Sequence, residues 1–186
     1  AAVDFGEPNG KRAVEKHGAR SGSLVILEPA TGAVRAICNA PGFDPNQYAQ
    51  VESANDYANG AISEAYEPGS VFKPITMAAA LENGALKPDS TYTDTGEVRI
   101  GPDVIRNSDF KSHGVQTMTQ VLEESLNTGA IYAMRQAGQA SFANMVQKFG
   151  FGERTGIELP SESPGNLRSL KEKREIYYAT ASFGQG

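Results

Sequence analysis

The chain has 186 residues, of which 39% are hydrophobic and 21% are charged, a balance typical of a single globular domain rather than a disordered or collagen-like segment. Its 17 basic and 22 acidic residues give a net charge of −5 without a basic run longer than two residues, so nucleic acid is not an expected partner. One cysteine and two histidines exclude an internal disulfide and a histidine-rich metal centre, and no apolar run is long enough to span a membrane. No metal or other cofactor is expected.

The first elements expected are a short helix and a β-hairpin. Residues 10–17 predict the helix, with Asn9 as its N-cap and Gly18 just past its end. Two β-rich runs, 23–27 and 33–38, flank a five-residue turn that contains proline and glycine. This pattern is typical of a hairpin.

The middle of the chain predicts one loop, one helix and one irregular stretch. Residues 39–54 carry Pro-Gly and Asp-Pro-Asn turn signals and are expected to be loop. A helix is expected from near Ser70 to Asn83, because Pro74 is tolerated only in the first turn, where its missing N–H is not needed. Residues 87–114 predict an irregular surface stretch with a minor hairpin.

Helices dominate the second half of the chain. Two capping-box patterns predict helix starts, and apolar residues at i, i+3, i+4 and i+7 predict a further helix. The expected elements are, in order, helices at 117–125, 128–136 and 142–149, a short strand at 157–159 and a helix at 169–177. A hairpin followed by a long helical run indicates an α+β fold.

The segment Tyr66-Glu-Pro-Gly-Ser-Val-Phe-Lys-Pro74 carries the pattern with the clearest chemical meaning. Ser70 opens the expected helix and Lys73 follows three residues later, so both side chains lie on one face about one turn apart. Serine is a weak nucleophile unless a base takes its proton, and lysine serves as that base when desolvation lowers its pKa. The N–H groups at the helix start suit a developing oxyanion. Ser70 and Lys73 therefore form a candidate nucleophile and base.

The bare Ser-x-x-Lys spacing is weak evidence by itself, because chance gives about 0.6 such pairs in a sequence of this composition. A second pair, Ser108-Asp-Phe-Lys111, is interpreted as a solvated loop since no apolar helix follows it. A Ser-x-Asn pattern also occurs at Ser53-Ala-Asn55 and Ser125-Leu-Asn127, and helix junctions commonly use such residues for backbone hydrogen bonds. Spacing alone leaves these alternatives open.

The order of several motifs along the chain separates the alternatives. The motifs are Glu67-Pro-Gly-Ser-Val-Phe-Lys-Pro74, Ser125-Leu-Asn127, Phe149-Gly-Phe-Gly152 with Thr155-Gly-Ile-Glu-Leu-Pro160, and Ser182-Phe-Gly-Gln-Gly186. Together they resemble the transpeptidase domain of penicillin-binding proteins, most closely the monofunctional class B enzymes, over residues 12–186. The resemblance implies the serine β-lactamase/penicillin-binding-protein transpeptidase fold, represented here by an N-terminal hairpin and a mainly helical region.

The resemblance also implies a role for each matching residue. Ser70 would be the nucleophile that attacks the D-Ala-D-Ala carbonyl of a peptidoglycan stem peptide, and Lys73 would deprotonate it. Ser125 would relay a proton to the leaving amine, while Asn127 would bind the peptide amide of the substrate and orient Lys73. The acyl-enzyme would then pass to an amine of a neighbouring stem, and a β-lactam would acylate Ser70 as a mimic of the donor.

A cellular setting follows from the same resemblance. The domain would work at the extracytoplasmic face of the bacterial cytoplasmic membrane, in the periplasm, held by an N-terminal anchor that precedes this sequence. Its expected partners are peptidoglycan stem peptides, β-lactam antibiotics and, in the full-length protein, a glycosyltransferase of the cell-wall machinery.

Two departures from the family pattern are visible. The family's third motif, Lys-Ser/Thr-Gly on a strand beside the nucleophile, is absent, and Arg154-Thr-Gly156 belongs to a loop that precedes it in the family. We therefore expect residues 1–186 to be a partial domain without its C-terminal strands. It should be weakly active or inactive, because losing one oxyanion donor lowers rates about a hundred- to thousandfold. Residues 1–8 do not match the family's leading helix and are interpreted as a join to foreign sequence.

Two other functions stay open. A serine β-lactamase or D,D-carboxypeptidase would use the same Ser-Lys apparatus and would need a general base to activate water, for which Glu123 and Glu124 are candidates. A non-enzymatic β-lactam-sensing domain would use the Ser70 adduct itself as its signal.

Overall fold

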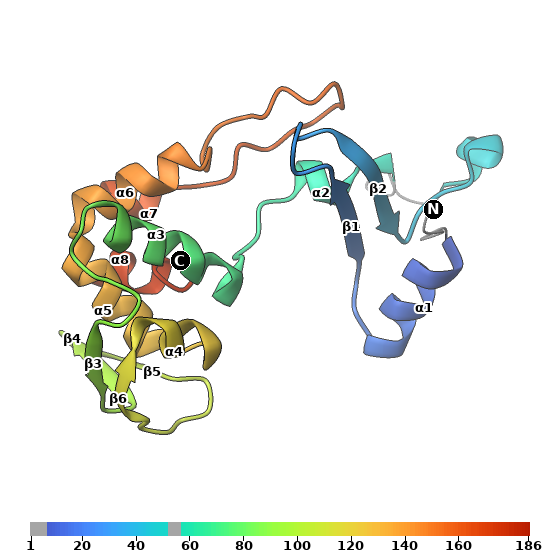
Figure 1. The fold of residues 1–186 in the computed structure, drawn as a ribbon. Coiled ribbons are helices and arrows are strands. Elements are labelled where there is room, and N and C mark those ends of the chain that lie inside the picture. Colours follow the sequence, from blue (N-terminus) through green and yellow to red (C-terminus); the bar gives the residue numbers. More distant parts are fainter. Residues whose placement is uncertain (1–6, 52–56) are drawn as a thin grey trace. The chain divides into compact units, whose positions relative to one another are not determined.

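The computed structural model describes residues 7–51 and 57–186, and these form two compact units (Figure 1). The units are Ala1–Ala65 with Gly156–Ser163, and Tyr66–Thr155 with Pro164–Gly186. The Ser53-Ala-Asn55 pattern lies outside the described residues, as do residues 1–6 of the expected join. Each unit is described by itself.

The first unit is built on one antiparallel hairpin. Its elements are α1 (Glu7–His17), β1 (Gly22–Leu27), β2 (Val34–Ala40), the 3-10 helix η1 (Pro45–Gln50) and α2 (Gly60–Ser63). β1 and β2 pair in antiparallel register, which confirms the expected hairpin, and α1 and α2 pack against it. The connecting turn closes because Gly32, at a φ of +73°, donates its N–H to the Glu28 carbonyl at 2.8 Å. Glycine adopts this left-handed conformation without strain.

Three local expectations in this unit are wrong. α1 begins at Glu7, so Asn9 lies inside the helix rather than at its cap. The expected loop contains η1, because Asp44 caps its first turn by accepting the N–H of Asn46 at 2.9 Å and a proline at the helix start needs no N–H partner. The stretch Ile157–Leu159 forms no strand.

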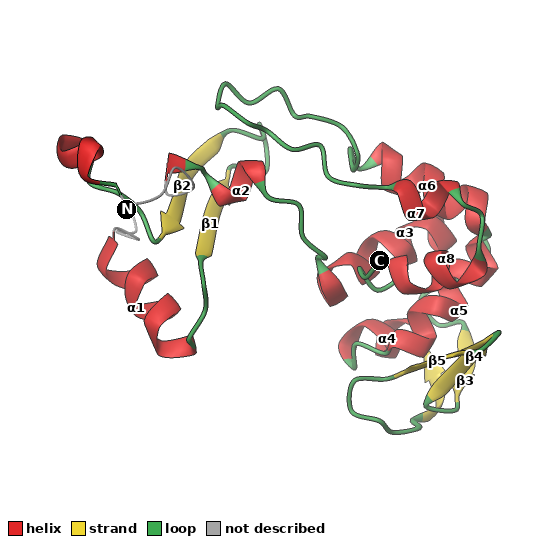
Figure 2. Cartoon of the chain, turned by 180° about the vertical axis from the view of Figure 1, so that it is seen from behind, coloured by secondary structure: helices red, strands yellow, loops and turns green. Residues whose placement is uncertain are grey.

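The second unit is mainly helical and carries two small sheets, which lie beside α4 and α5 (Figure 2). Its helical elements are η3 (Gly69–Phe72), α3 (Lys73–Glu82), α4 (Met118–Glu123), α5 (Asn127–Ala137), α6 (Gln139–Lys148), α7 (Arg168–Lys171) and α8 (Glu175–Ala181). Its strands are β3 (Thr91–Asp94), β4 (Glu97–Ile100), β5 (Asp103–Arg106) and β6 (Gly114–Thr117). β3 pairs with β6 and β4 with β5, both antiparallel, so the β4–β5 hairpin is inserted in the connection between β3 and β6.

The core of the second unit lies where α3, α5 and α6 pack on one another. Ile131 and Met134 from α5 and Phe142 and Val146 from α6 are almost fully buried. For α6 this agrees with the apolar spacing in the sequence. The ring of Phe142 also meets Tyr178 of α8 edge-on, with centroids 6.2 Å apart. Each large apolar side chain buried in this way contributes about 1.5–3 kcal/mol to folding. The helix α3 therefore packs against a well-buried core formed with α5 and α6.

The structure confirms the helices expected for α3, α5 and α6 and corrects three other expectations. The helix expected at 117–125 has its capping box but ends at Glu123. The helix expected at 169–177 is divided into α7 and α8, because Lys173 takes a left-handed φ of +51°. The stretch 87–114, expected to hold one minor hairpin, contributes to four strands.

A hairpin in the first unit and a helical second unit give the α+β architecture that the motif order predicts. Over the described ranges, no helix combines the length and the apolar character needed to cross a bilayer. The same residues hold no group of three or more histidine, cysteine, aspartate or glutamate side chains placed to bind a metal ion.

Candidate active site

Local sequence places Ser70 and Lys73 one helical turn apart. The 3-10 turn η3 carries Ser70, and α3 continues from it at once with Lys73. Pro74 lies in the first turn of α3, where its nitrogen needs no hydrogen bond. Phe72 is buried between these residues, which anchors the turn in the core and leaves Ser70 exposed.

Lys73 joins two serines from distant parts of the chain. Its ammonium donates to Ser70 Oγ at 3.1 Å, to Ser125 Oγ at 3.0 Å and to the Ser125 carbonyl oxygen at 2.5 Å. These three bonds use all the donors of a protonated lysine. None of the partners is a carboxylate, so the lysine is held by neutral oxygens alone.

Burial sets the acidity of Lys73. The residue is only 2% exposed, and desolvation lowers its pKa from an ordinary value of 10.5 to about 8. Burial has this direction because it disfavours the charged form of an amine. A lysine with a pKa near 8 has an appreciable neutral fraction at neutral pH, and its neutral form can accept a proton from a hydroxyl.

Ser125 occupies a strained turn between α4 and α5. It has a left-handed φ of +55°, a conformation that costs a non-glycine residue on the order of 1–3 kcal/mol. Buried Leu126 holds this turn by donating its N–H to the Val121 carbonyl at 3.0 Å. Because of the turn, both oxygens of Ser125 face Lys73. The sequence predicts that Ser125 continues the helix α4, and that position does not imply this orientation.

Asn127 stands next to this group but is held differently. It is the first residue of α5 and its Nδ2 donates to the Arg106 carbonyl at 2.9 Å. Among the described residues no hydrogen bond joins Asn127 to Lys73. The structure therefore brings Ser70, Lys73 and Ser125 into one hydrogen-bonded group and places the half-buried Asn127 beside it in sequence, with its amide turned to β5.

A buried polar network supports the start of α5, and sequence reasoning missed it. Asp94 is only 1% exposed, and its carboxylate accepts four hydrogen bonds. The donors are Thr128 Oγ1 at 2.7 Å and the Gly96 N–H, Asn107 Nδ2 and His113 N–H, each at 2.9 Å. The side-chain oxygen of Asn107 in turn accepts the N–H of Thr128 at 3.2 Å. Within residues 7–51 and 57–186 Asp94 forms no ion pair, and these four hydrogen bonds compensate the burial of its carboxylate.

One signal in the sequence could have pointed to this carboxylate. Side chains alternate between the two faces of a strand, so Asp94 shares a face of β3 with Tyr92, and both are buried. The hydroxyl of Tyr92 lies 3.1 Å from Thr128 Oγ1. Burial raises the pKa of Tyr92 to about 12; the hydrogen bond with Thr128 opposes this rise, and the nearby Asp94 carboxylate adds a smaller increase. The Tyr92 hydroxyl therefore keeps its proton throughout the neutral range.

The competing patterns have other surroundings. Ser108 and Lys111 are both exposed on the loop between β5 and β6, and Arg154-Thr-Gly156 forms no strand. The proposed bases for a hydrolase, Glu123 and Glu124, are exposed at the end of α4. No hydrogen bond among the described residues joins either glutamate to Ser70 or Ser125.

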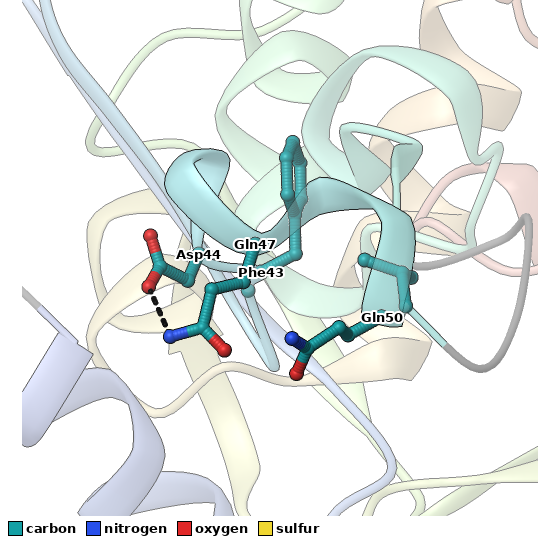
Figure 3. Close-up of a pocket in the computed structure, with 6 residues that line it drawn as sticks. Phe43, Asp44, Gln47 and Gln50 are labelled. Atoms are coloured by element: carbon teal, nitrogen blue, oxygen red, sulfur yellow. Dashed lines mark hydrogen bonds between the residues drawn. The ribbon is translucent and has the colours of Figure 1, made fainter.

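A separate shallow hollow of about 240 Å³ lies in the first unit (Figure 3). Its lining residues are Gly42, Phe43, Asp44, Gln47, Gln50 and Val51. Figure 3 shows the amide of Gln47 turned to Asp44, to which it donates at 3.3 Å. Asp44 is the only ionisable residue in this lining, and its carboxylate is engaged with Asn46 and Gln47.

Comparisons with known proteins bear on the group around Lys73. The family model of the penicillin binding protein transpeptidase domain matches residues 22–186. Penicillin-binding protein PbpB of Mycolicibacterium smegmatis is 36% identical over 94% of this chain and 27% of its own length. The probable peptidoglycan D,D-transpeptidase PenA of Neisseria flavescens is 33% identical over 94% of this chain and 43% of its own length. The chain thus spans less than half of each of these relatives.

The fold has a close counterpart among solved structures. The crystal structure of penicillin-binding protein 3 from Mycobacterium tuberculosis, complexed with ampicillin, superposes with a TM-score of 0.86 and 32% sequence identity. The match covers 97% of this chain and 40% of that one.

Proposed function

Because the chain belongs to the penicillin-binding protein transpeptidase family, we propose that it carries the acylation centre of a peptidoglycan D,D-transpeptidase. Ser70 is the nucleophile, Lys73 its base, Ser125 a proton relay and Asn127 a substrate-binding residue. The observation that carries the proposal is the buried amine of Lys73 within 3.1 Å of both serine hydroxyl oxygens. Desolvation of that amine lowers its pKa to about 8, as a general base at neutral pH requires.

Acylation is a transfer of an acyl group from an amine to Ser70. The Ser70 oxygen attacks the carbonyl carbon of the penultimate D-alanine of a stem peptide, and its proton passes to the neutral amine of Lys73. The C–N bond to the terminal D-alanine then breaks. The proton returns from Lys73 through the hydroxyl of Ser125 to the leaving amine, so the step releases a neutral D-alanine amine and leaves an ester on Ser70.

The pKa of Lys73 suits this step. At pH 7 a group with a pKa of about 8 is about one tenth neutral, a few hundredfold more than a lysine in water. Its conjugate acid is still strong enough to give the proton back. A general base of this strength contributes roughly a hundred- to ten-thousandfold to a rate.

Asn127 and the nucleophile's own backbone complete the proposed site. The Nδ2 group of Asn127 is engaged with Arg106, which leaves Oδ1 to accept a peptide N–H of the substrate. The N–H of Ser70, in the first turn of η3, is one oxyanion donor, since the first N–H groups of a helix have no partner within it. The acyl group finally passes to an amine of a neighbouring stem, which forms the cross-link.

Substrate and location follow from the same proposal. Stem peptides that end in D-Ala-D-Ala lie outside the bacterial cytoplasmic membrane, so the domain works on the extracytoplasmic face, anchored by a segment that precedes these residues. A glycosyltransferase that supplies the glycan strand is the expected partner. β-Lactams acylate Ser70 in place of the stem peptide, which agrees with the ampicillin complex of the similar mycobacterial protein.

The test is covalent labelling by a fluorescent penicillin, with the modified residue identified by peptide mass spectrometry. We expect Ser70→Ala to abolish labelling and Ser108→Ala to leave it intact. The 186 residues contain no Lys-Ser-Gly or Lys-Thr-Gly string, so we expect labelling of this chain to be about a hundred- to thousandfold slower than that of a site with both oxyanion donors. A label on any residue other than Ser70 contradicts the assignment, and rapid stoichiometric labelling contradicts the expected slow rate.

A further inference from the structure

The motif Ser182-Phe-Gly-Gln-Gly186 lies against the turn that carries Ser70. The N–H of Gly69, the residue before the nucleophile, donates to the Gly184 carbonyl at 2.9 Å. Gly184 has a left-handed φ of +78°, and a Cβ added to it would lie 2.6 Å from the Gly69 nitrogen and still closer to the Gly69 oxygen. Only glycine fits at a backbone contact of this kind.

The same segment is fixed to the core and to α3. Phe183 is 5% exposed and Ser182 is fully buried. The Ser182 carbonyl accepts a hydrogen bond from Thr76 Oγ1 at 2.7 Å, and Thr76 lies three residues beyond Lys73 on α3. The segment therefore contacts the chain on both sides of the Ser70–Lys73 pair.

A second tie lies ahead of the nucleophile. The N–H of Gly186 donates to the carboxylate of Glu67 at 2.8 Å, three residues before Ser70. The carboxylate of Glu67 therefore has a specific partner 119 residues away in the sequence.

We propose that residues 182–186 form a strap that positions the nucleophile, with Gly184 and Glu67 as its positioning residues. The inference rests on the proposed function of Ser70. The strap holds the Gly69 peptide, and this peptide determines where the Ser70 N–H and hydroxyl lie relative to Lys73. Misplacing a reacting group by about 1 Å can lower a rate about a hundredfold, so a strap of this kind acts on the acylation step itself.

The main experiment compares Gly184→Ala with Gly150→Ala in the full 186-residue chain. Gly150 also follows a helix and has a φ of +84°, but an added Cβ there meets no atom within 4 Å. Both variants place an alanine at a similar left-handed φ, so the main difference between them is the contact with Gly69. We expect Gly184→Ala to lower the limiting rate of acylation by a fluorescent penicillin about a hundredfold with an unchanged half-saturating concentration, and Gly150→Ala to acylate at the wild-type rate.

The exposed Glu67 provides a second test that does not need Gly184→Ala to fold. Glu67→Ala should lower the acylation rate two- to tenfold, as expected for one exposed hydrogen bond, and Glu67→Gln should restore it because its amide oxygen accepts the same N–H. Equal rates for wild type, Gly184→Ala and Glu67→Ala overturn the inference, and so does a Glu67→Gln variant as slow as Glu67→Ala.

Amide hydrogen exchange, followed by NMR, separates this inference from the proposed function. The Gly69 N–H should be protected in the wild type and in Glu67→Gln and exchange faster in Glu67→Ala. A penicillin label on a residue other than Ser70, together with this exchange pattern, overturns the proposed function and leaves the strap standing as the support of the turn. An unprotected Gly69 N–H in the wild type overturns the strap whatever the activity.

Discussion

The chain holds two Ser-x-x-Lys pairs with the same spacing and opposite surroundings. Lys73 is 2% exposed and binds two serine hydroxyl groups, whereas Lys111 lies exposed on a loop. In the loop it is the backbone of Lys111 that is engaged, with its N–H on Asp109 and its carbonyl on Asn107. The spacing alone therefore does not indicate a reactive pair. What distinguishes Lys73 is its burial beside a second serine hydroxyl.

The difference between the pairs arises from the residues that come after each lysine. Lys73 is followed by Pro74 and by an apolar helix that packs in the core, so its side chain is buried with that helix. The segment after Ser108 instead turns back to β6, and its Ser112 hydroxyl and His113 N–H donate hydrogen bonds to Asp94. We interpret the loop 107–113 as a structural support of the start of α5, while the 69–73 turn carries the reactive groups.

The largest effect is expected at the centre of that support. Asp94→Asn replaces an acceptor by an amide that faces the N–H donors of Asn107 and His113, so at least one buried polar group loses its partner. We expect the free energy of unfolding to fall by about 2–4 kcal/mol. Asp109→Asn on the same loop removes an exposed pair with His113 and should leave the free energy of unfolding almost unchanged. Urea denaturation measures the free energy of unfolding of both variants. Equal changes in the two would contradict a structural role for the network around Asp94.

A smaller effect should follow from the pKa of Lys73. This pKa is about 8 in the folded chain and near 10.4 in the unfolded chain, so between these values the unfolded chain binds more protons and stability rises with pH. From pH 7 to 9.5 the rise is about 2 kcal/mol. This gain in stability is lost as the pH falls through 8. Above pH 10 an opposite effect reduces it, because the unfolded chain loses the Tyr92 proton that the folded chain keeps.

The check is the difference between variants in urea denaturation at the two pH values. Lys73→Met should abolish the rise, whereas Lys111→Met should retain it, because only Lys73 is buried. A rise that survives in Lys73→Met would mean that other groups cause it.

Local signals predicted part of this architecture. The position of Pro74 fixed the start of α3, and Thr117 with Gln120 formed the expected capping box, because both effects act within one helical turn. The family resemblance, rather than spacing, selected Ser70, Lys73 and Ser125 among several similar patterns. The structure then supplied a physical reason for that selection, namely the shared amine of Lys73.

Long-range contacts could not be predicted in the same way. The β3–β6 pair is separated by a complete hairpin, and Asp94 meets Thr128 from 34 residues away, so neither leaves a local pattern. The left-handed turn at Ser125 is imposed by the packing of Leu126, against the preference of serine. The contact of Gly184 with Gly69 likewise joins two motifs whose separation in the sequence says nothing about their distance in space.

The smallest effect contrasts two left-handed residues, one in each region. Ser125 has a φ of +55° and Phe110, exposed in the loop, one of +60°. Phe110→Gly relieves the strain and loses no side-chain hydrogen bond, so it should stabilise the chain by about 1 kcal/mol and leave acylation unchanged. Ser125→Gly relieves the same strain but loses the bond from Lys73 to the Ser125 hydroxyl, which contributes a similar amount. Stability should therefore stay within about 0.5 kcal/mol, while acylation falls about tenfold or more. Thermal unfolding measures the stability of each variant, and penicillin labelling measures its acylation rate. If Ser125→Gly gained as much stability as Phe110→Gly, the hydroxyl bond to Lys73 would contribute nothing to the fold.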